Sequence, residues 1–281
     1  MTLPNASRSS AYTVEQRQAA GVQAEGESKP HYGKMHAVPA RDVVASSGWL
    51  PETLYRGFEI VVALIGLAAG LPFILIAAVL IRCDSSGRAL FFHKRPARSI
   101  MMRGSDLIGR TDLWPPPDGY EPDTLYYVPS YFILPKLRTM HSDARNRFPE
   151  LYAYEYAPGE FHRQYPTHRQ DPRVTRVGRI LRKLSIDELP NLWSVLVGDM
   201  RLVGPRPEAP EVLQYYTPEE MYKFACKPGI TGLAQINGRG YLNWGETLAW
   251  DLQYVRARSV ARDLKIIFVT LKRVITRRGA F

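Results

Sequence analysis

The sequence predicts an α-rich α+β protein that is associated with a membrane, and three observations carry this fold class. The chain has one long uncharged segment interrupted by a proline, two basic segments with helical periodicity, and a stretch rich in proline and tyrosine that fits neither pattern. We therefore expect a Pro-broken membrane helix, amphipathic helices at the membrane interface, and a small irregular or β part.

Composition narrows the class of protein. With 281 residues, 45% hydrophobic and 23% charged, the chain has room for a sizeable core and is neither fibrous nor wholly disordered. Lys and Arg number 37 against 27 Asp and Glu, and this net charge of +10 implies an anionic partner: nucleic acid, phosphorylated metabolites or a membrane surface. The two cysteines, Cys83 and Cys226, form no CxxC pair, which argues against a disulfide framework and a cysteine zinc site.

Residues 1–50 lack hydrophobic periodicity and predict a disordered tail. The uncharged segment follows, running for twenty-two residues from Ile60 to Ile81, long enough for the hydrocarbon core of a bilayer. Pro72 removes a helical hydrogen bond, so we expect a break or kink there. Basic residues flank both ends, which leaves open two half-helices that enter and leave by one face and a single kinked span.

Two further features of this segment carry expectations. Glu59, at its entrance, is expected to lie in water. Gly66 and Gly70 have the GxxxG spacing of a close helix contact face.

Residues 96–135 are expected to form a long loop or small subdomain. The prolines in Trp114–Gly119 argue against a long helix or a central strand. Eight of the sixteen tyrosines lie between Tyr120 and Tyr165. A lid over a ligand, a surface against lipid headgroups and an aromatic satellite core are all compatible with that cluster.

Residues 173–183 and 263–278 each predict a basic amphipathic helix, because apolar residues recur at helical spacing with Arg and Lys between them. Such helices suit an anionic membrane surface. A solvated charged face over a soluble core is the alternative.

The segment Ser185–Pro190 carries the carboxylate pair Asp187 and Glu188. Ser185 with Glu188 fits a capping box, and Asp187 alone fits a helix cap equally well. A carboxylate kept ionised by nearby cations such as Arg182 can also act as a nucleophile or hold a divalent cation. Simple capping is the competing interpretation.

Two later blocks favour chemistry on phosphates. Arg206 stands between Pro205 and Pro207, which fix the backbone around a guanidinium that fits phosphate oxygens. Four glycines in Lys227–Gly240 permit close backbone approach, but the P-loop and GxGxxG spacings are absent, which argues against a nucleotide kinase and a Rossmann enzyme. The histidines are scattered, which argues against a zinc hydrolase.

These blocks resemble the bacterial sugar transferases, the monotopic polyprenyl-phosphate phosphoglycosyl transferases. The resemblance runs through Arg56, Phe91-Phe92 and the K-L-R-T-M block beginning at Lys136. It is continuous from Asp171 to about Arg273, including DPRVTRVGRILRKLSIDELPNLWSVLVGDMRLVGPRPE. It implies transfer of a sugar 1-phosphate from a UDP-sugar to polyprenyl (undecaprenyl) phosphate with release of UMP. This would be the initiating step of envelope polysaccharide, exopolysaccharide or glycoconjugate synthesis.

The resemblance also implies roles for individual residues. Asp187 would be the nucleophile that forms a covalent phosphosugar intermediate, and Glu188 would assist with the metal or the acceptor phosphate. Asp187 and Asp251 would lie at a Mg²⁺ ion. The arginines expected to bind phosphate oxygens are Arg182, Arg206 and Arg239.

The domain organisation follows from the same resemblance. Residues 51–95 would form a membrane-anchoring re-entrant segment bent at Pro72, with both ends on the cytosolic face of the bacterial inner membrane. Residues 96–281 would form the catalytic domain, with insertions near 96–135 and 145–170. Membrane lipids are expected partners, and homo-oligomerisation is left open.

Two rival functions compete with the transferase. A non-catalytic membrane scaffold of polysaccharide assembly would retain the fold, but the intact Asp187, Glu188 and Arg206 argue against it. A nucleic-acid-binding module would need a groove-reading element, and the apolar segment argues against one.

Overall fold

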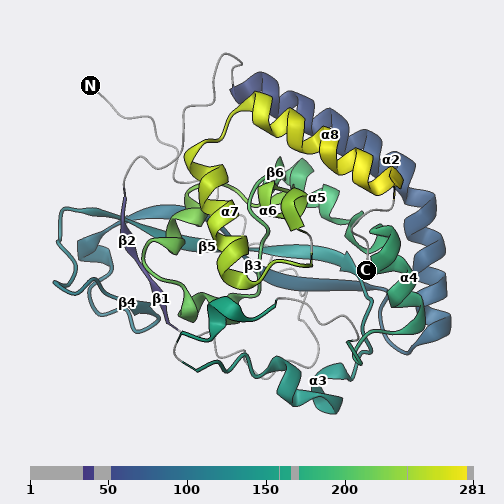
Figure 1. The fold of residues 1–281 in the computed structure, drawn as a ribbon, viewed down its shortest axis with the longest axis horizontal. Coiled ribbons are helices and arrows are strands. Elements are labelled where there is room, and N and C mark those ends of the chain that lie inside the picture. Colours follow the sequence, from purple (N-terminus) through teal and green to yellow (C-terminus); the bar gives the residue numbers. More distant parts are fainter. Residues whose placement is uncertain (1–33, 41–51, 158, 166–170, 239, 277–281) are drawn as a thin grey trace. The chain divides into compact units, whose positions relative to one another are not determined.

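The computed structural model describes residues 34–40, 52–157, 159–165, 171–238 and 240–276 of the chain. It has the mixed helix and strand content that we predicted (Figure 1). The helices are α2 (Glu52–Asp84), α3 (Ala144–Arg147), α4 (Arg176–Leu184), α5 (Asn191–Val197), α6 (Leu233–Gly238), α7 (Trp244–Arg256) and α8 (Val260–Thr276). The strands are β1 (Met35–His36), β2 (Val38–Pro39), β3 (Leu90–Arg103), β4 (Leu113–Trp114), β5 (Leu125–Leu137), β6 (Arg201–Val203) and β7 (Gly229–Thr231).

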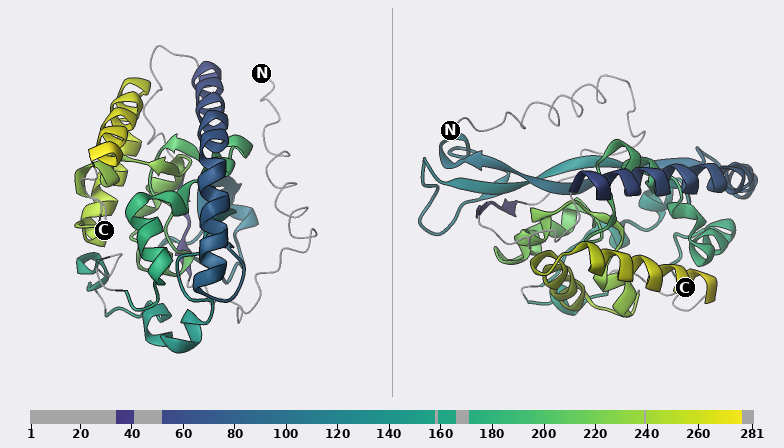
Figure 2. Two further views of the ribbon diagram at one scale, coloured as in Figure 1. Left: turned by 90° about the vertical axis from the view of Figure 1, so that its right-hand side faces the viewer. Right: turned by 90° about the horizontal axis from the view of Figure 1, so that it is seen from above.

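The apolar segment forms α2, which is long and apolar enough to cross a membrane. Its most apolar 18-residue window has a mean hydropathy of 2.7, and 17% of that window is buried within the protein. The helix is continuous through Pro72, but Figures 1 and 2 show that it changes direction about halfway along. The break predicted at Pro72 therefore takes the form of a bend, as expected where proline removes a helical hydrogen bond.

One side of α2 packs against the rest of the protein. The GxxxG glycines face α5 and the turn before it: a Cβ at Gly66 would lie 2.9 Å from Leu192 Cδ1, and one at Gly70 would lie 3.3 Å from Leu189 Cδ1. The predicted contact face is therefore used within this chain.

The expectation that Glu59 lies in water is wrong. Its side chain is fully buried, and it accepts hydrogen bonds from Arg201 Nε at 3.1 Å and from the Leu202 backbone N–H at 3.0 Å. A buried carboxylate is tolerated where a cation and a backbone donor replace its hydration. The pair ties α2 to β6.

The prediction of an irregular region over residues 96–135 is wrong for residues 96–103 and 125–135, about half of its length. The strands β3 and β5 form a long antiparallel hairpin from Leu90↔Leu137 to Arg103↔Leu125, with a change of register between Pro96 and Ser99. β2 adds a third strand, giving the order β2-β5-β3. Only the connection over residues 104–124, which holds the Trp114–Gly119 proline run, is largely irregular.

The prolines of the hairpin are accommodated by its geometry. Pro96 begins the change of register on β3, an edge strand of the sheet. Pro129 and Pro135 lie on β5, whose pairing with β2 among the described residues is confined to Tyr126 and Tyr127. Strands with one side unpaired tolerate the missing N–H of proline, so these three prolines are compatible with the hairpin.

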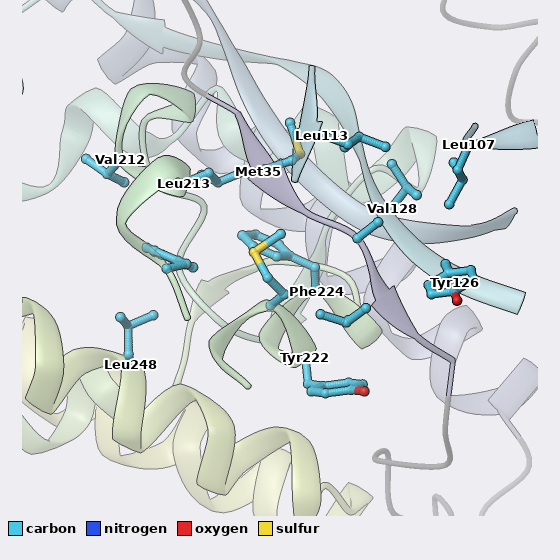
Figure 3. Packing of buried hydrophobic residues seen from close by; sticks show 14 of the residues in the cluster. Met35, Leu107, Leu113, Tyr126, Val128, Val212, Leu213, Tyr222, Phe224 and Leu248 are labelled. Carbon is cyan, nitrogen blue, oxygen red and sulfur yellow. The ribbon is translucent and has the colours of Figure 1, made fainter. Parts of the chain in front are cut away.

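The predicted disordered tail is wrong for residues 34–40, where β1 pairs with β4 and β2 pairs with β5. Met35 and Val38 are buried in the larger hydrophobic core. Figure 3 shows Met35 lying with Leu113 and Leu213 in this core. The other residues of that tail, 1–33 and 41–50, lie outside the described residues.

Most tyrosines of the tyrosine-rich segments are buried in the same core or pack against it. Of the three alternatives for this cluster, the aromatic core agrees best with the structure. Phe161 stacks on Tyr215 and on Trp244 with ring centroids 5.2 Å apart in each case. Tyr126 is buried, and Tyr154 and Tyr156 pack against this core. These contacts anchor the described part of the predicted 145–170 insertion to the 3-10 segment Pro210–Tyr215 and to α7.

Both amphipathic helices form close to their predicted bounds, as α4 and α8. Thr175 caps α4 by accepting a hydrogen bond from the Gly178 backbone N–H at 2.9 Å. A second core, between α2 and α8, contains Ala63, Val195 and Ile266. The outward apolar side chains of these helices include Ile180, Leu184, Leu264, Phe268 and Leu271.

Candidate active site

The carboxylate pair lies in a sharp turn between α4 and α5. Ser185 ends α4 in the left-handed conformation, with φ 56°, and residues Ile186–Glu188 form a 3-10 turn. Pro190 then begins α5, and no side-chain capping bond is present at Ser185 or at Pro190. No helix begins directly after Asp187 either, so both capping predictions are wrong.

Asp187 is buried, with 8% of its surface exposed, and its Oδ1 atom has no hydrogen-bond partner among the described residues. Burial and then the neighbouring Glu188 charge raise the pKa of its carboxyl, while Lys136, Arg182 and Arg206 oppose that rise. A desolvated carboxylate of raised pKa is a stronger nucleophile and a stronger ligand for a cation than a solvated one.

Glu188 is held by two cations from distant parts of the chain. Its Oε1 atom accepts hydrogen bonds from Lys136 Nζ at 3.2 Å and from Arg206 Nη2 at 2.8 Å. Lys136 lies near the end of β5, and Arg206 lies in the loop that follows β6. The pair of carboxylates is thus surrounded by positive charge.

The Gly-Pro-Arg-Pro loop that carries Arg206 is fixed by close backbone packing. A Cβ on Gly204 would lie 2.5 Å from the Lys227 carbonyl oxygen, and a Cβ on Gly229 would lie 2.0 Å from the Gly204 nitrogen. The Gly229 N–H donates to the Pro205 carbonyl at 2.9 Å. Gly204 of the loop and Gly229 of the Lys227–Gly240 block therefore permit the close backbone packing that holds the arginine loop in place.

The K-L-R-T-M block connects the site to α2 and α4. Arg182 Nε donates to Thr139 Oγ1 at 2.9 Å, which orients the guanidinium near Asp187. Arg138 donates to the carbonyls of Ser85 and Arg88, at 2.9 and 2.7 Å, and so holds the end of α2. From the sequence we used this block only for the family resemblance and did not assign Lys136 or Thr139 to the site. The presence of Lys136, a basic residue, in a block shared with the family could have indicated that it contacts the carboxylates or a phosphate.

Asp251 lies on α7, fully buried, and among the described residues its close partner is a lysine. Lys223 Nζ is 3.0 Å from Asp251 Oδ2 and also pairs with Glu208, which accepts from Tyr216 Oη at 2.6 Å. Burial raises the pKa of Asp251 to about 6. This network is close to the arginine loop, since Glu208 is two residues beyond Arg206 and Asp251 interacts electrostatically with Arg206.

The residues predicted to bind phosphate and metal are therefore only partly brought together. Asp187, Glu188, Arg182 and Arg206 share one site, whereas no contact joins Asp251 to Asp187 among the described residues, and Arg239 lies outside them. In the part of the chain that the structure describes, no group of three or more His, Cys, Asp or Glu side chains could hold a metal ion by protein ligands alone.

The part of the chain that is similar to known proteins includes the residues of this site. Residues 128–277 match the family model described as bacterial sugar transferase, a range that contains Lys136, Asp187 and Arg206. An undecaprenyl-phosphate glucose phosphotransferase of Komagataeibacter xylinus is 36% identical over 237 residues, which are 80% of this chain and 36% of that relative.

Two other relatives are covered over more of their length. The exopolysaccharide production protein ExoY of Sinorhizobium fredii is 31% identical over 80% of this chain and 87% of its own length. A UDP-glucose:undecaprenyl-phosphate glucose-1-phosphate transferase of Caulobacter vibrioides is 36% identical over 80% of this chain and 71% of its own length.

Proposed function

Because the chain belongs to the bacterial sugar transferase family, we propose that it transfers a sugar 1-phosphate from a UDP-sugar to undecaprenyl phosphate or a similar polyprenyl phosphate, releasing UMP. Relatives named for transfer of glucose or galactose phosphate to this lipid support the reaction class. ExoY, a relative named for exopolysaccharide production, supports an initiating role in the synthesis of such a polymer.

The observation that carries the proposal is the Asp187 carboxylate. It is buried, its Oδ1 atom has no partner among the described residues, and Lys136, Arg182 and Arg206 lie within electrostatic range. Phosphoryl transfer requires a positioned nucleophile and positive charge around the phosphate oxygens. This site combines both.

In the proposed first step, a carboxylate oxygen of Asp187 attacks the phosphorus that bears the sugar. The bond from this phosphorus to the bridging oxygen breaks, UMP leaves with the bonding electrons, and a phosphosugar remains bonded to Asp187. Arg206 and Arg182 would neutralise charge on the phosphate oxygens. Glu188 pairs with Lys136 and Arg206 and would hold the side chains of these two residues in position beside the phosphate.

In the second step, a phosphate oxygen of the polyprenyl acceptor attacks the same phosphorus. The bond to Asp187 breaks, its carboxylate is regenerated, and the polyprenyl diphosphate sugar is released. A covalent intermediate allows a water-soluble donor and a lipid acceptor to use the site in turn.

Asp187 also fits a role in holding Mg²⁺ together with the donor phosphates. Its unpartnered oxygen is a hard ligand of the kind that Mg²⁺ prefers, and Mg²⁺ commonly takes one or two carboxylates and completes its shell with water and phosphate. When bound, the ion would supply charge neutralisation at the diphosphate. Asp251 fits this role less well, because the ammonium of Lys223 already balances its charge.

We further propose that α2 inserts into the inner membrane from the cytosolic face and returns to it, with its bend in the bilayer. The exposed apolar surface of α2 supports insertion, and its change of direction supports a re-entrant path. The outward apolar residues of α4 and α8 would then meet the lipid interface, where basic neighbours attract anionic headgroups.

A donor screen tests the activity. Detergent-solubilised protein with Mg²⁺ and undecaprenyl phosphate would be given UDP-glucose, UDP-galactose and other UDP-sugars, and UMP would be measured. We expect UMP with at least one donor and a lipid-linked diphosphate sugar as coproduct. Formation of UDP instead of UMP would contradict phosphosugar transfer.

A further inference from the structure

A further cation of the site lies on β3. Arg95 is partly buried, and its Nε atom is buried without a hydrogen-bond partner among the described residues. No carboxylate of those residues forms an ion pair with it. A buried N–H of this kind has lost its hydration without an acceptor among the described residues, which is costly unless a ligand supplies one.

The position of Arg95 in the sheet brings it toward the active site. It pairs across the hairpin with Phe132, directly before the change of register that begins at Pro96. Such irregularities alter the direction in which strand side chains point. Lys136 extends from β5, the partner strand of the same hairpin.

The electrostatic neighbours of Arg95 include cations already assigned to the site. Arg206 and Lys136 both interact repulsively with it, while Glu208 and Glu211 attract it without forming ion pairs. Burial lowers the pKa of Arg95 to about 10, which leaves it charged at neutral pH. Three cations therefore converge, and Glu188 pairs with two of them.

The insertion that follows the hairpin completes this side of the site. Tyr154, which also interacts electrostatically with Arg95, has φ 47°, a left-handed conformation that is costly for a bulky residue. Tyr215 Oη donates to the Tyr154 carbonyl at 2.7 Å and accepts from the Tyr156 N–H at 3.2 Å. The fold thus maintains a strained residue near an arginine whose Nε atom has no partner in the described part of the chain.

We propose that Arg95 is a further substrate-binding residue, which contacts a phosphate group together with Arg206. An anion between the two guanidinium groups would turn their repulsion into two charge-assisted hydrogen-bonding contacts. This inference rests on the proposed function for the identity of the anion, which is the donor diphosphate or the acceptor phosphate.

The test compares Arg95→Gln and Arg95→Lys with Arg103→Gln, an exposed arginine at the far end of the same strand. Binding of inorganic pyrophosphate without Mg²⁺ would be measured by calorimetry, with the thermal midpoint of each variant. We expect Arg95→Gln to weaken binding by on the order of 10- to 100-fold, Arg95→Lys to be intermediate, and Arg103→Gln to match the wild type.

The two half-reactions then identify the phosphate. A higher donor KM for UMP release without acceptor would assign Arg95 to the donor, whereas slower transfer from a preformed intermediate alone would assign it to the acceptor. Either supports the proposal. Pyrophosphate binding by Arg95→Gln equal to that of Arg103→Gln would overturn it, as would a loss matched by an equal fall in thermal midpoint in both Arg95 variants.

These readouts separate the inference from the proposed function. A wild-type protein that binds pyrophosphate through Arg95 but releases no UMP from any UDP-sugar would contradict the transferase and leave the anion contact in place. If the wild type releases UMP, and Arg95→Gln is unchanged in pyrophosphate binding and in both half-reactions, the transferase is supported and the anion contact of Arg95 is contradicted.

Discussion

Arg206 Nη2 lies 2.8 Å from Glu188 Oε1, so the arginine of one loop is fixed to the second carboxylate of another. Lys136 Nζ reaches the same oxygen at 3.2 Å. Because these cations satisfy Glu188, the adjacent Asp187 keeps an oxygen without a partner among the described residues. The two acidic neighbours therefore have different surroundings: Glu188 is paired with two cations, whereas Asp187, the nucleophile that we propose, keeps a free oxygen among the described residues.

Substitutions of the charged neighbours of Asp187 should shift the pH profile of UMP release in opposite directions. In the proposed mechanism the ionised carboxylate is the active form, so activity should fall as pH drops through its raised pKa. Glu188→Gln removes a charge that raises this pKa and should move the acid limb to lower pH. Lys136→Gln removes a charge that lowers it and should move the limb to higher pH.

Both variants should also lower kcat/KM at pH 7 by on the order of 10- to 100-fold, because each disturbs the charge around the phosphate. Profiles of kcat/KM measured from pH 4 to 9, about the range over which a carboxyl shifted upward titrates, would check the directions. Acid limbs that move the same way in the two variants would contradict the assignment of Asp187 as the titrating group.

The buried Glu59 should be important for the attachment of α2. Glu59→Gln leaves the buried Arg201 with only the exposed Glu52 as a carboxylate partner, and breaking a buried pair costs about 3–5 kcal/mol. We expect a clearly lower thermal midpoint in detergent. Glu219→Gln is the matched control: its pair with Arg256 is exposed and should change stability by less than about 1 kcal/mol. Equal effects of the two substitutions would count against a structural ion pair.

The close contact between α2 and α5 predicts different results at two glycines of one helix. A Cβ at Gly66 meets Leu192, whereas nothing lies within 4 Å of a Cβ at Gly57. Gly66→Val should destabilise by about 1–3 kcal/mol more than Gly57→Val, through overpacking. Thermal midpoints check this, and Leu192→Ala should reduce the difference. Similar midpoints for the two valine variants would show that the contact is loose.

The re-entrant path that we propose for α2 predicts that both of its ends face the cytosol. Cys83 is exposed and Cys226 is buried, so Cys83→Ser provides the background for Gly57→Cys and Ser86→Cys. In intact spheroplasts a membrane-impermeant thiol reagent should label neither position, and after permeabilisation it should label both. Labelling of one position alone in intact spheroplasts would establish a single span.

Much of the site could be predicted from sequence because its chemistry depends on local residue types. Asp187 beside Glu188 and Arg206 between two prolines are visible without a fold, and the family resemblance assigned their roles. The role of Lys136 was not visible in this way, because its contact with Glu188 spans 52 residues of sequence. The prediction that Glu59 lies in water failed for the same reason, because its partner Arg201 lies 142 residues away in the sequence.

Helices with strong apolar periodicity were predicted correctly. Elements were missed where tertiary structure overrides the conformational preference of single residues. α2, α4 and α8 follow apolar patterns that the sequence displays directly. The β3–β5 hairpin was missed because we extended the argument from the prolines in Trp114–Gly119 to all of residues 96–135, whereas that run lies in the connection between the two strands. Pro96, Pro129 and Pro135 lie within the strands, at a register change or on a strand that is unpaired on one side. The capping predictions failed because Ser185 takes a left-handed conformation that propensity does not indicate.

The central claim is that Asp187 carries the phosphosugar, and intact-protein mass spectrometry tests it most directly. After incubation with an active UDP-sugar and Mg²⁺ but no lipid acceptor, the wild type should gain the mass of one sugar phosphate and release a matching amount of UMP. Asp118→Asn, an exposed acid in the loop between β3 and β5, should behave as the wild type. We expect Asp187→Asn to show neither the adduct nor UMP, whereas UMP release by that variant at the wild-type rate would contradict the account.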